Sequence, residues 1–328
     1  MDKTHLPDQD NQDYIADHPY KGVEYIPHMP TRSVEYILAH AETLIGLPVD
    51  QVRNYPDIEG MFYDFLRHCE IGNMHAISFT EDGQVLLDSR IKMMILVGFR
   101  IGEIVPVYDN GLPSYDKCTY LPQEFKDFAE RGIRINPMGA GVRRGAHLGD
   151  KSSLMNGAYV NVGGYVGERT MIDTNALVGS CAYVGNDCHI SAGVVIGGVL
   201  EPVNARPCIV ENNVMIGANS LITEGVHLKE NVVVAPLVGL TASTAVYDFV
   251  TGDIYRSTPE NPLVIPTGAV IVPGAIPYIY GSERSTVMDS ILLRIVNGTF
   301  DPEMEQWPKM LLWRTGAVSY THLRAHET

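Results

Sequence analysis

Asp173 is the side chain of this sequence whose position best suits acid–base chemistry. It follows Ile172 directly in the run Met171-Ile172-Asp173-Thr174-Asn175. If Ile172 is buried, as the six-residue repeat of the chain predicts, Asp173 leaves the fold at an edge. Packing of that edge against a second one would partly desolvate the carboxylate, which makes it a better proton acceptor near neutral pH. Asp173 is therefore a candidate general base.

Arg134 is the candidate for binding an anionic substrate. It ends the segment Arg131-Gly132-Ile133-Arg134, just before the repeat begins. A guanidinium binds a carboxylate through two parallel hydrogen bonds, so this position suits a carboxylate substrate.

Other chemistries have weaker signals. The three histidines of the repeat region, His147, His189 and His227, do not recur at a spacing that would cluster them, and Cys181 and Cys188 lack partners at ligand spacing. We therefore expect no catalytic metal. The Gly-rich segment 139–145 lacks the GxGxxG spacing and precedes repeat sequence instead of a helix, which argues against a dinucleotide site.

A six-residue repeat must position these side chains. From Val142 every sixth residue is aliphatic for ten steps; the register then slips by two residues, and seven more aliphatic positions follow. The first series is Val142, Leu148, Leu154, Val160, Val166, Ile172, Val178, Val184, Ile190 and Ile196; the second is Val210, Ile216, Ile222, Leu228, Val234, Leu240 and Val246. Neither a helix nor a single strand has this period. The period is typical of a coil with three short strands per turn, stacked at about 4.8 Å.

The sequence thus predicts a mainly β protein, a parallel β-helix over residues 134–277. Val264, Val270 and Ile276 keep the same step and predict one more coil. Two interruptions, at 197–209 and 247–262, predict loops projecting from the column. Such loops on a rigid scaffold are common places for function.

The flanking segments follow other patterns. Residues 1–30 form a polar leader, and residues 31–133 predict a helical α+β domain. Within it we expect helices after the capping candidates Thr31 and Ser33, over 57–68 and 88–99, and over 123–130, with a hairpin in 75–87. Residues 278–328 are a C-terminal extension, and its last residues, 315–328, continue neither pattern and predict a tail foreign to the fold.

Composition limits the functional classes. The chain has 24 basic and 39 acidic residues, a net charge of −15, so we expect no nucleic-acid partner. No apolar run approaches the roughly 20 residues of a membrane span, so we expect no membrane partner. Five scattered cysteines and no secretory signal predict a cytoplasmic protein with reduced thiols.

Several motifs make the sequence similar to a known family. The run MIDTNALVGSCAYVG (171–185), the loop GGVLEP (197–202) and RGIRINP (131–137) resemble tetrahydrodipicolinate N-succinyltransferase, and SRIKMMILVGFRIG (89–102) and LTASTAVYDFVTG (240–252) also fit. The likeness covers about residues 86–276. It implies a left-handed β-helix and a homotrimer with active sites between adjacent columns.

The resemblance also implies a reaction and site residues. The family transfers succinyl from succinyl-CoA to the amino group of ring-opened tetrahydrodipicolinate, in lysine and diaminopimelate biosynthesis, with no tightly bound cofactor. Arg134 matches the family's substrate-binding arginine, and Asp173 its acidic active-site residue. The expected CoA contacts lie along the groove between columns and in the second loop: Ala218, Ala235, Ser243 and Arg256.

One departure from the family leaves alternatives open. Some members carry a second acidic residue where this chain has Leu221, and the nearby Glu224 is out of register. Either Asp173 works alone or a second carboxylate is not required. The alternatives to a succinyltransferase are an acetyl-CoA-dependent N-acetyltransferase of the same fold and a non-enzymatic β-solenoid scaffold.

Overall fold

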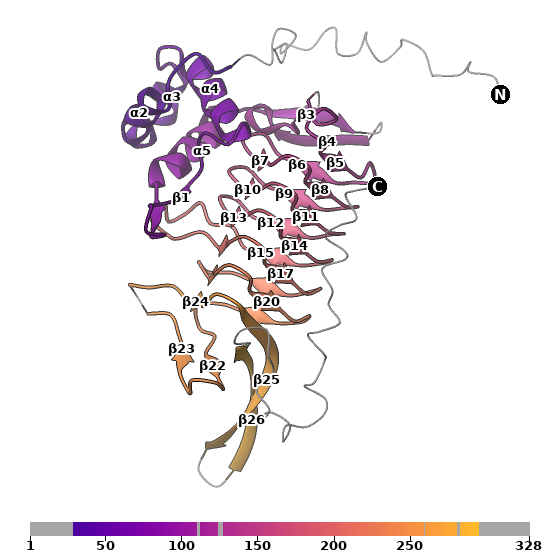
Figure 1. Cartoon of the computed structure of the whole chain (residues 1–328). Coiled ribbons are helices and arrows are strands. Elements are labelled where there is room, and N and C mark those ends of the chain that lie inside the picture. The colour runs from indigo at the N-terminus through magenta and orange to yellow at the C-terminus, as the bar shows by residue number, and fades with distance from the viewer. Residues whose placement is uncertain (1–28, 110–111, 124–126, 259, 281–282, 295–328) are drawn as a thin grey trace, which may run out of the picture.

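A helical part sits at one end of a column of short stacked strands (Figure 1). The computed structural model describes residues 29–109, 112–123, 127–258, 260–280 and 283–294. The helical part contains four helices, α2 (Val34–Gly46), α3 (Val49–Arg53), α4 (Ile58–Glu70) and α5 (Ser89–Ile101). It also contains two antiparallel hairpins and a short 3-10 helix: β1 (Ile77–Phe79) with β2 (Val85–Leu87), β3 (Ile104–Asp109) with β4 (Leu112–Lys117), and Cys118–Tyr120.

Side-chain caps set the starts of two of these helices. The Ser33 hydroxyl accepts a hydrogen bond from the Tyr36 N–H at 3.2 Å, and the Asp88 carboxylate accepts one from the Arg90 N–H at 3.0 Å. The helices expected after Ser33, over 57–68 and over 88–99 are confirmed, as is the hairpin in 75–87. The sequence did not predict α3 or the β3–β4 hairpin. Of the helix expected over 123–130, residues 124–126 lie outside the described part and 127–130 form turns.

The column is a left-handed parallel β-helix, as predicted, built from three parallel sheets of two-residue strands. The first sheet contains β5 (Arg134–Ile135), β8 (Ser153–Leu154), β11 (Met171–Ile172), β14 (His189–Ile190), β17 (Met215–Ile216) and β20 (Val233–Val234). The second contains β6 (Gly141–Val142), β9 (Tyr159–Val160), β12 (Leu177–Val178), β15 (Val195–Ile196), β18 (Leu221–Ile222) and β21 (Gly239–Leu240). The third contains β7 (His147–Leu148), β10 (Tyr165–Val166), β13 (Tyr183–Val184), β16 (Ile209–Val210), β19 (His227–Leu228) and β24 (Val264–Ile265).

The repeat predicted the interior correctly. Each of the seventeen aliphatic positions has a relative exposure of 2% or less. Ile172 pairs with Ile190, the third aliphatic position after it, so one turn of the column is three hexads. The small residues two places before the aliphatic positions, such as Ala158, Ala176 and Ala182, are also buried where the chain turns between sheets.

The last coil has a different register from the one predicted. Ile265 and Ile271 are the buried residues, paired with Leu228 and Val234. Val264 and Val270, which the six-residue step placed inside, occupy the outward positions of their strands. The prediction of a further coil was right, but its phase was wrong by one residue, because the insertion before it is not a multiple of six.

Both interruptions project from the column. The first lies between β15 and β16, and Lys92 of α5, fully buried, donates a hydrogen bond to the Ala205 carbonyl within it. The second, predicted as a loop, contains the antiparallel strands β22 (Val246–Asp248) and β23 (Ile254–Tyr255). Beyond it β25 (Ala269–Tyr280), which extends the first sheet, and β26 (Glu283–Arg294) form a long hairpin at the far end of the column (Figure 1). The predicted tail at 315–328 and the leader up to residue 28 lie outside the described residues.

The helical part covers the outer face of the third sheet. His147 stacks on Tyr165 with ring centroids 4.6 Å apart, and Tyr165 stacks on Tyr183 at 4.8 Å. His75, just before β1, packs against Tyr165 at 4.9 Å. The outer face of β7, β10 and β13 is therefore occupied by the helical part, and the predicted site residues Arg134 and Asp173 lie away from it.

Candidate active site

One edge of the column carries Asp173 and lies next to Arg134. It consists of the turns between the first and second sheets, residues 136–140, 155–158, 173–176, 191–194, 217–220 and 235–238, and we call it the Asp173 edge. The residue directly after each buried aliphatic position on this edge is, in successive coils, Met155, Asp173, Ser191, Gly217 and Ala235. Asp173 is its only acidic residue within the described part of the chain.

The Asp173 carboxylate is held but still accessible. Its backbone N–H donates to the Ile190 carbonyl at 2.8 Å, which ties it into the coil-to-coil ladder. One carboxylate oxygen, Oδ1, accepts the Thr174 N–H at 2.6 Å, and the side chain is 30% exposed. The other oxygen, Oδ2, lies 3.7 Å from Nε2 of His189 in the next coil. A carboxylate so placed can accept a proton from a bound group.

Arg134 reaches the same edge. It lies at the start of β5, exposed on the outer face of the first sheet, and its Nη2 atom is 3.9 Å from the Met155 sulfur. Met155 stands one coil before Asp173, which is roughly 5 Å along the column. The Arg134 backbone lies two coils before Met171, the neighbour of Asp173, which is roughly 10 Å along the column, so the two side chains lie near the same edge at different levels.

The four residues predicted to contact CoA fall into two groups. Ala218 and Ala235 lie on the Asp173 edge, two and three coils beyond Asp173. Ser243 and Arg256 do not. Ser243 lies in the turn after β21, where its hydroxyl contacts that of Thr241 at 2.9 Å, and Arg256 follows β23, with Nη2 3.4 Å from the Tyr247 hydroxyl. The Asp173 edge therefore includes the first pair of predicted CoA contacts and not the second pair.

Leu221 and Glu224 lie in different places. Leu221 is on the outer face of the second sheet and is 39% exposed. The Glu224 carboxylate belongs to the edge between the second and third sheets, where it accepts the Ala242 N–H at 2.8 Å. Glu224 therefore does not replace a carboxylate at position 221.

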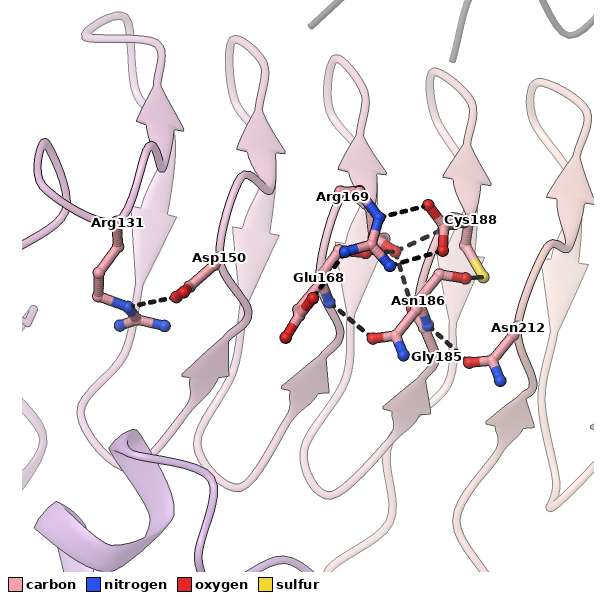
Figure 2. Close-up of polar contacts among 10 residues, drawn as sticks. Arg131, Asp150, Glu168, Arg169, Gly185, Asn186, Cys188 and Asn212 are labelled. Atoms are coloured by element: carbon pink, nitrogen blue, oxygen red, sulfur yellow. Dashed lines mark hydrogen bonds and ion pairs between the residues drawn. The ribbon is translucent and has the colours of Figure 1, made fainter. Parts of the chain in front are cut away.

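The edge between the third and first sheets is charged, but its charges pair with one another (Figure 2). Arg169 binds both carboxylate oxygens of Asp187, at 2.7 and 2.9 Å, and also Glu168 at 2.6 Å. The Asn186 side chain accepts the Glu168 N–H, and the Asn212 side chain accepts the Asn186 N–H, both at 2.8 Å. These contacts link successive coils to one another along this edge.

Thiol chemistry is disfavoured inside the column. All five cysteines are free. Burial raises the pKa of Cys181 and of Cys188 to about 12, and that of Cys208 to about 11. A thiol with so high a pKa supplies little thiolate at neutral pH.

Potential metal ligands do not cluster in the part of the chain that the structure describes. It contains no group of three or more His, Cys, Asp or Glu side chains arranged to hold a metal ion. Within the same residues, no helix is both long enough and apolar enough to cross a membrane.

Comparisons with known proteins agree with the repeat. A family profile described as the hexapeptide repeat of succinyl-transferase matches residues 166–197 and 207–236. Several similar proteins are named 2,3,4,5-tetrahydropyridine-2,6-dicarboxylate N-succinyltransferase. The one from Ralstonia nicotianae is 43% identical over 203 residues, which are 60% of this chain and 70% of the relative. The one from Azoarcus sp. is 44% identical over 204 residues, with the same coverage, and the one from Polynucleobacter asymbioticus is 38% identical over 231 residues, 69% of this chain and 80% of the relative.

Proposed function

We propose, because the chain belongs to the 2,3,4,5-tetrahydropyridine-2,6-dicarboxylate N-succinyltransferase family, that it transfers succinyl from succinyl-CoA to the amino group of ring-opened tetrahydrodipicolinate. The products are N-succinyl-2-amino-6-oxopimelate and CoA, in lysine and diaminopimelate biosynthesis. The observation that carries the proposal at the level of residues is the Asp173 edge, with its one carboxylate one coil from the Met155 sulfur that Arg134 contacts.

In the proposed mechanism Arg134 binds a carboxylate of the substrate and Asp173 receives a proton from its amine. As the nitrogen attacks the thioester carbonyl, the new C–N bond forms and the C–S bond breaks, and the CoA sulfur leaves as a thiolate that is then protonated. A positioned base contributes about 10²–10⁴ in rate. Binding both reactants side by side supplies much of the remainder.

We propose that succinyl-CoA lies along the Asp173 edge, with its pantetheine arm beside Ala218 and Ala235. Small side chains there leave room for a narrow, flexible arm. Ser243 and Arg256 are proposed as contacts for a more distant part of CoA, such as a phosphate, because they lie off this edge. No tightly bound cofactor is needed for this reaction.

We further propose a homotrimer, with each site between two columns. The exposed apolar side chains Leu221 and Leu237, 39% and 71% exposed in the single chain, lie beside the Asp173 edge and suit contact with a neighbouring subunit or ligand. Sedimentation equilibrium tests this: the expected mass is about three times the 36.1 kDa of the chain.

The test of the function is a coupled assay with purified protein, tetrahydrodipicolinate and either succinyl-CoA or acetyl-CoA. We expect CoA release with succinyl-CoA and much less with acetyl-CoA. The D173N variant should lose about 10²–10⁴ in kcat while its circular dichroism and mass are unchanged. Its matched control is Asp150→Asn, on the edge between the third and first sheets. This replacement removes the carboxylate that pairs with Arg131 and leaves the Asp173 edge unchanged. Equal activity of D173N and the wild type would show that Asp173 is not the base. Release of CoA from acetyl-CoA alone would show that the acyl donor is acetyl-CoA and not succinyl-CoA.

A further inference from the structure

His189 carries a buried ring nitrogen for which the described residues offer no hydrogen-bond partner. The residue lies in β14 on the outer face of the first sheet, one coil after Met171, and its side chain is 18% exposed. Its Nε2 atom is buried and makes no hydrogen bond within the described part of the chain. A carboxylate oxygen, Asp173 Oδ2, lies 3.7 Å from it. A buried unpaired polar atom costs free energy, so one beside a candidate catalytic group calls for an explanation.

The other two histidines of the column each have a partner. His147 Nδ1 hydrogen-bonds the Glu70 carbonyl at 2.9 Å, under the helical part. His227 Nε2 hydrogen-bonds Glu211 Oε1 at 2.6 Å. Both contacts fix ring orientation as part of the fold. Of the three, His189 is the one whose ring nitrogen faces the candidate base at an edge where a substrate can bind.

The chemistry of the pair indicates which tautomer it uses. If Nε2 carried no proton, its lone pair would face the lone pairs of a carboxylate. A proton on Nε2 instead makes it a donor to Asp173. The present separation of Nε2 and Oδ2 is longer than a hydrogen bond, and catalytic hydrogen bonds are often long before the substrate binds.

We propose that His189 is a positioning residue for Asp173, donating a hydrogen bond from Nε2 to Oδ2 when the amine substrate is bound. The proposal rests on the proposed function. With the Thr174 N–H on Oδ1 and the imidazole on Oδ2, both oxygens are held and the carboxylate plane is fixed. Each oxygen keeps a second lone pair, so Asp173 can still receive the amine proton.

The experiment compares three variants for fold, mass and kinetics. H189L removes the hydrogen-bond donor at similar side-chain volume, and H189Q keeps an N–H donor near the position of Nε2. M215L is the matched control, because Met215 pairs with His189 in the next coil of the first sheet. We expect H189L to lose about 10- to 100-fold in kcat with little change in KM for succinyl-CoA, since misplacing a catalytic group has effects of this size. H189Q should recover most of that loss, and M215L should behave as the wild type. In a D173N background, H189L should cost nothing further.

Several results would overturn the proposal. They are equal losses in H189L and H189Q, a loss in M215L as large as that in H189L, or an H189L effect that is undiminished in the D173N background.

Failure of the proposed function gives a different result. If the wild type releases no CoA from succinyl-CoA, the pairing is still tested by the ¹⁵N chemical shifts of the His189 ring. A protonated Nε2 whose shift changes in D173N supports the pair, and an unprotonated Nε2 refutes it.

Discussion

Leu237 occupies a backbone conformation that leucine rarely adopts, and this makes its replacement a quantitative test of the fold. It lies at the turn position of the Asp173 edge where the preceding coils carry Asn175, Gly193 and Asn219. All four residues have φ between 57° and 69°. A left-handed conformation costs an ordinary residue about 1–2 kcal/mol, whereas Asn and Gly adopt it readily.

The expected gain from Leu237→Asn follows from two opposing effects. Leu237 is 71% exposed, so less than a third of its surface is buried, and the replacement loses only that share of the stabilisation. Full burial of a leucine stabilises by about 1.5–3 kcal/mol, so the loss here is about 0.4–0.9 kcal/mol. Relief of the backbone conformation outweighs this in the dissociated chain, where we expect L237N to raise the free energy of unfolding by about 0.5–1 kcal/mol.

The reciprocal variant is Asn231→Leu, on the edge between the third and first sheets. Asn231 has φ 61° and is exposed. It should lose about as much stability as L237N gains. Urea midpoints of both variants, measured at two protein concentrations, test the pair. If L237N were less stable at both concentrations, the backbone argument would fail. If it were less stable only where subunits associate, Leu237 would be buried by a second copy, and its exposure in the single chain would not apply.

Three further predictions concern the column and its cover. First, burial lowers the pKa of His147 to about 4, so between about pH 6.5 and 4 the unfolded chain binds more protons than the folded one. The contribution of His147 to the free energy of unfolding should therefore be constant above this window and fall by about 1–3 kcal/mol as the pH is lowered through it. Urea midpoints should show a smaller fall in H147F. Second, Ile190→Ala should destabilise by about 2–5 kcal/mol and Ile190→Val by about 0.5–1.5 kcal/mol, a ratio that calorimetry can check and that equal effects would contradict. Third, Lys92→Met removes the hydrogen bond to the Ala205 carbonyl, so the amide hydrogens of the loop 197–209 should exchange faster than in the wild type, as measured by mass spectrometry, while Lys151→Met, on another edge, should leave that rate unchanged. An unchanged exchange rate in Lys92→Met would contradict this.

Hydrophobic period alone was enough to predict the interior of the column. If the fold is a column with this repeat, every sixth aliphatic residue must point into its interior. Seventeen such positions leave little choice in the register of the strands. The same rule failed at Val264 and Val270, because an insertion resets the phase and only the pairing of Ile265 with Leu228 fixes it again. Periodicity is thus informative within an uninterrupted run and uninformative across a loop of unknown path.

The neighbour of the candidate base could also have been found from the sequence. Ile190 stands one coil after Ile172, so His189 must lie beside Met171 and close to Asp173. A test for metal ligands compares the histidines only with each other, and so it overlooks a histidine next to an acid. By contrast, the cover over the third sheet depends on contacts between segments far apart in the chain, such as His147 with Glu70, which no local pattern predicts.

Leu221, at a position where the family resemblance implies an acidic residue in some members, bears on the proposed His189–Asp173 pair. A second carboxylate near the site would hold the amine from another side, but Leu221 cannot, and Glu224 is occupied with the Ala242 N–H on another edge. Asp173 is then the single acid of its edge in the described structure, and a lone carboxylate is useful as a base only if its orientation is fixed. The Thr174 N–H fixes one oxygen, and His189 is the side chain placed to fix the other. If a second carboxylate can hold the amine, Leu221→Glu should reduce the loss of kcat caused by H189L, and an undiminished loss in the double variant would contradict this reasoning.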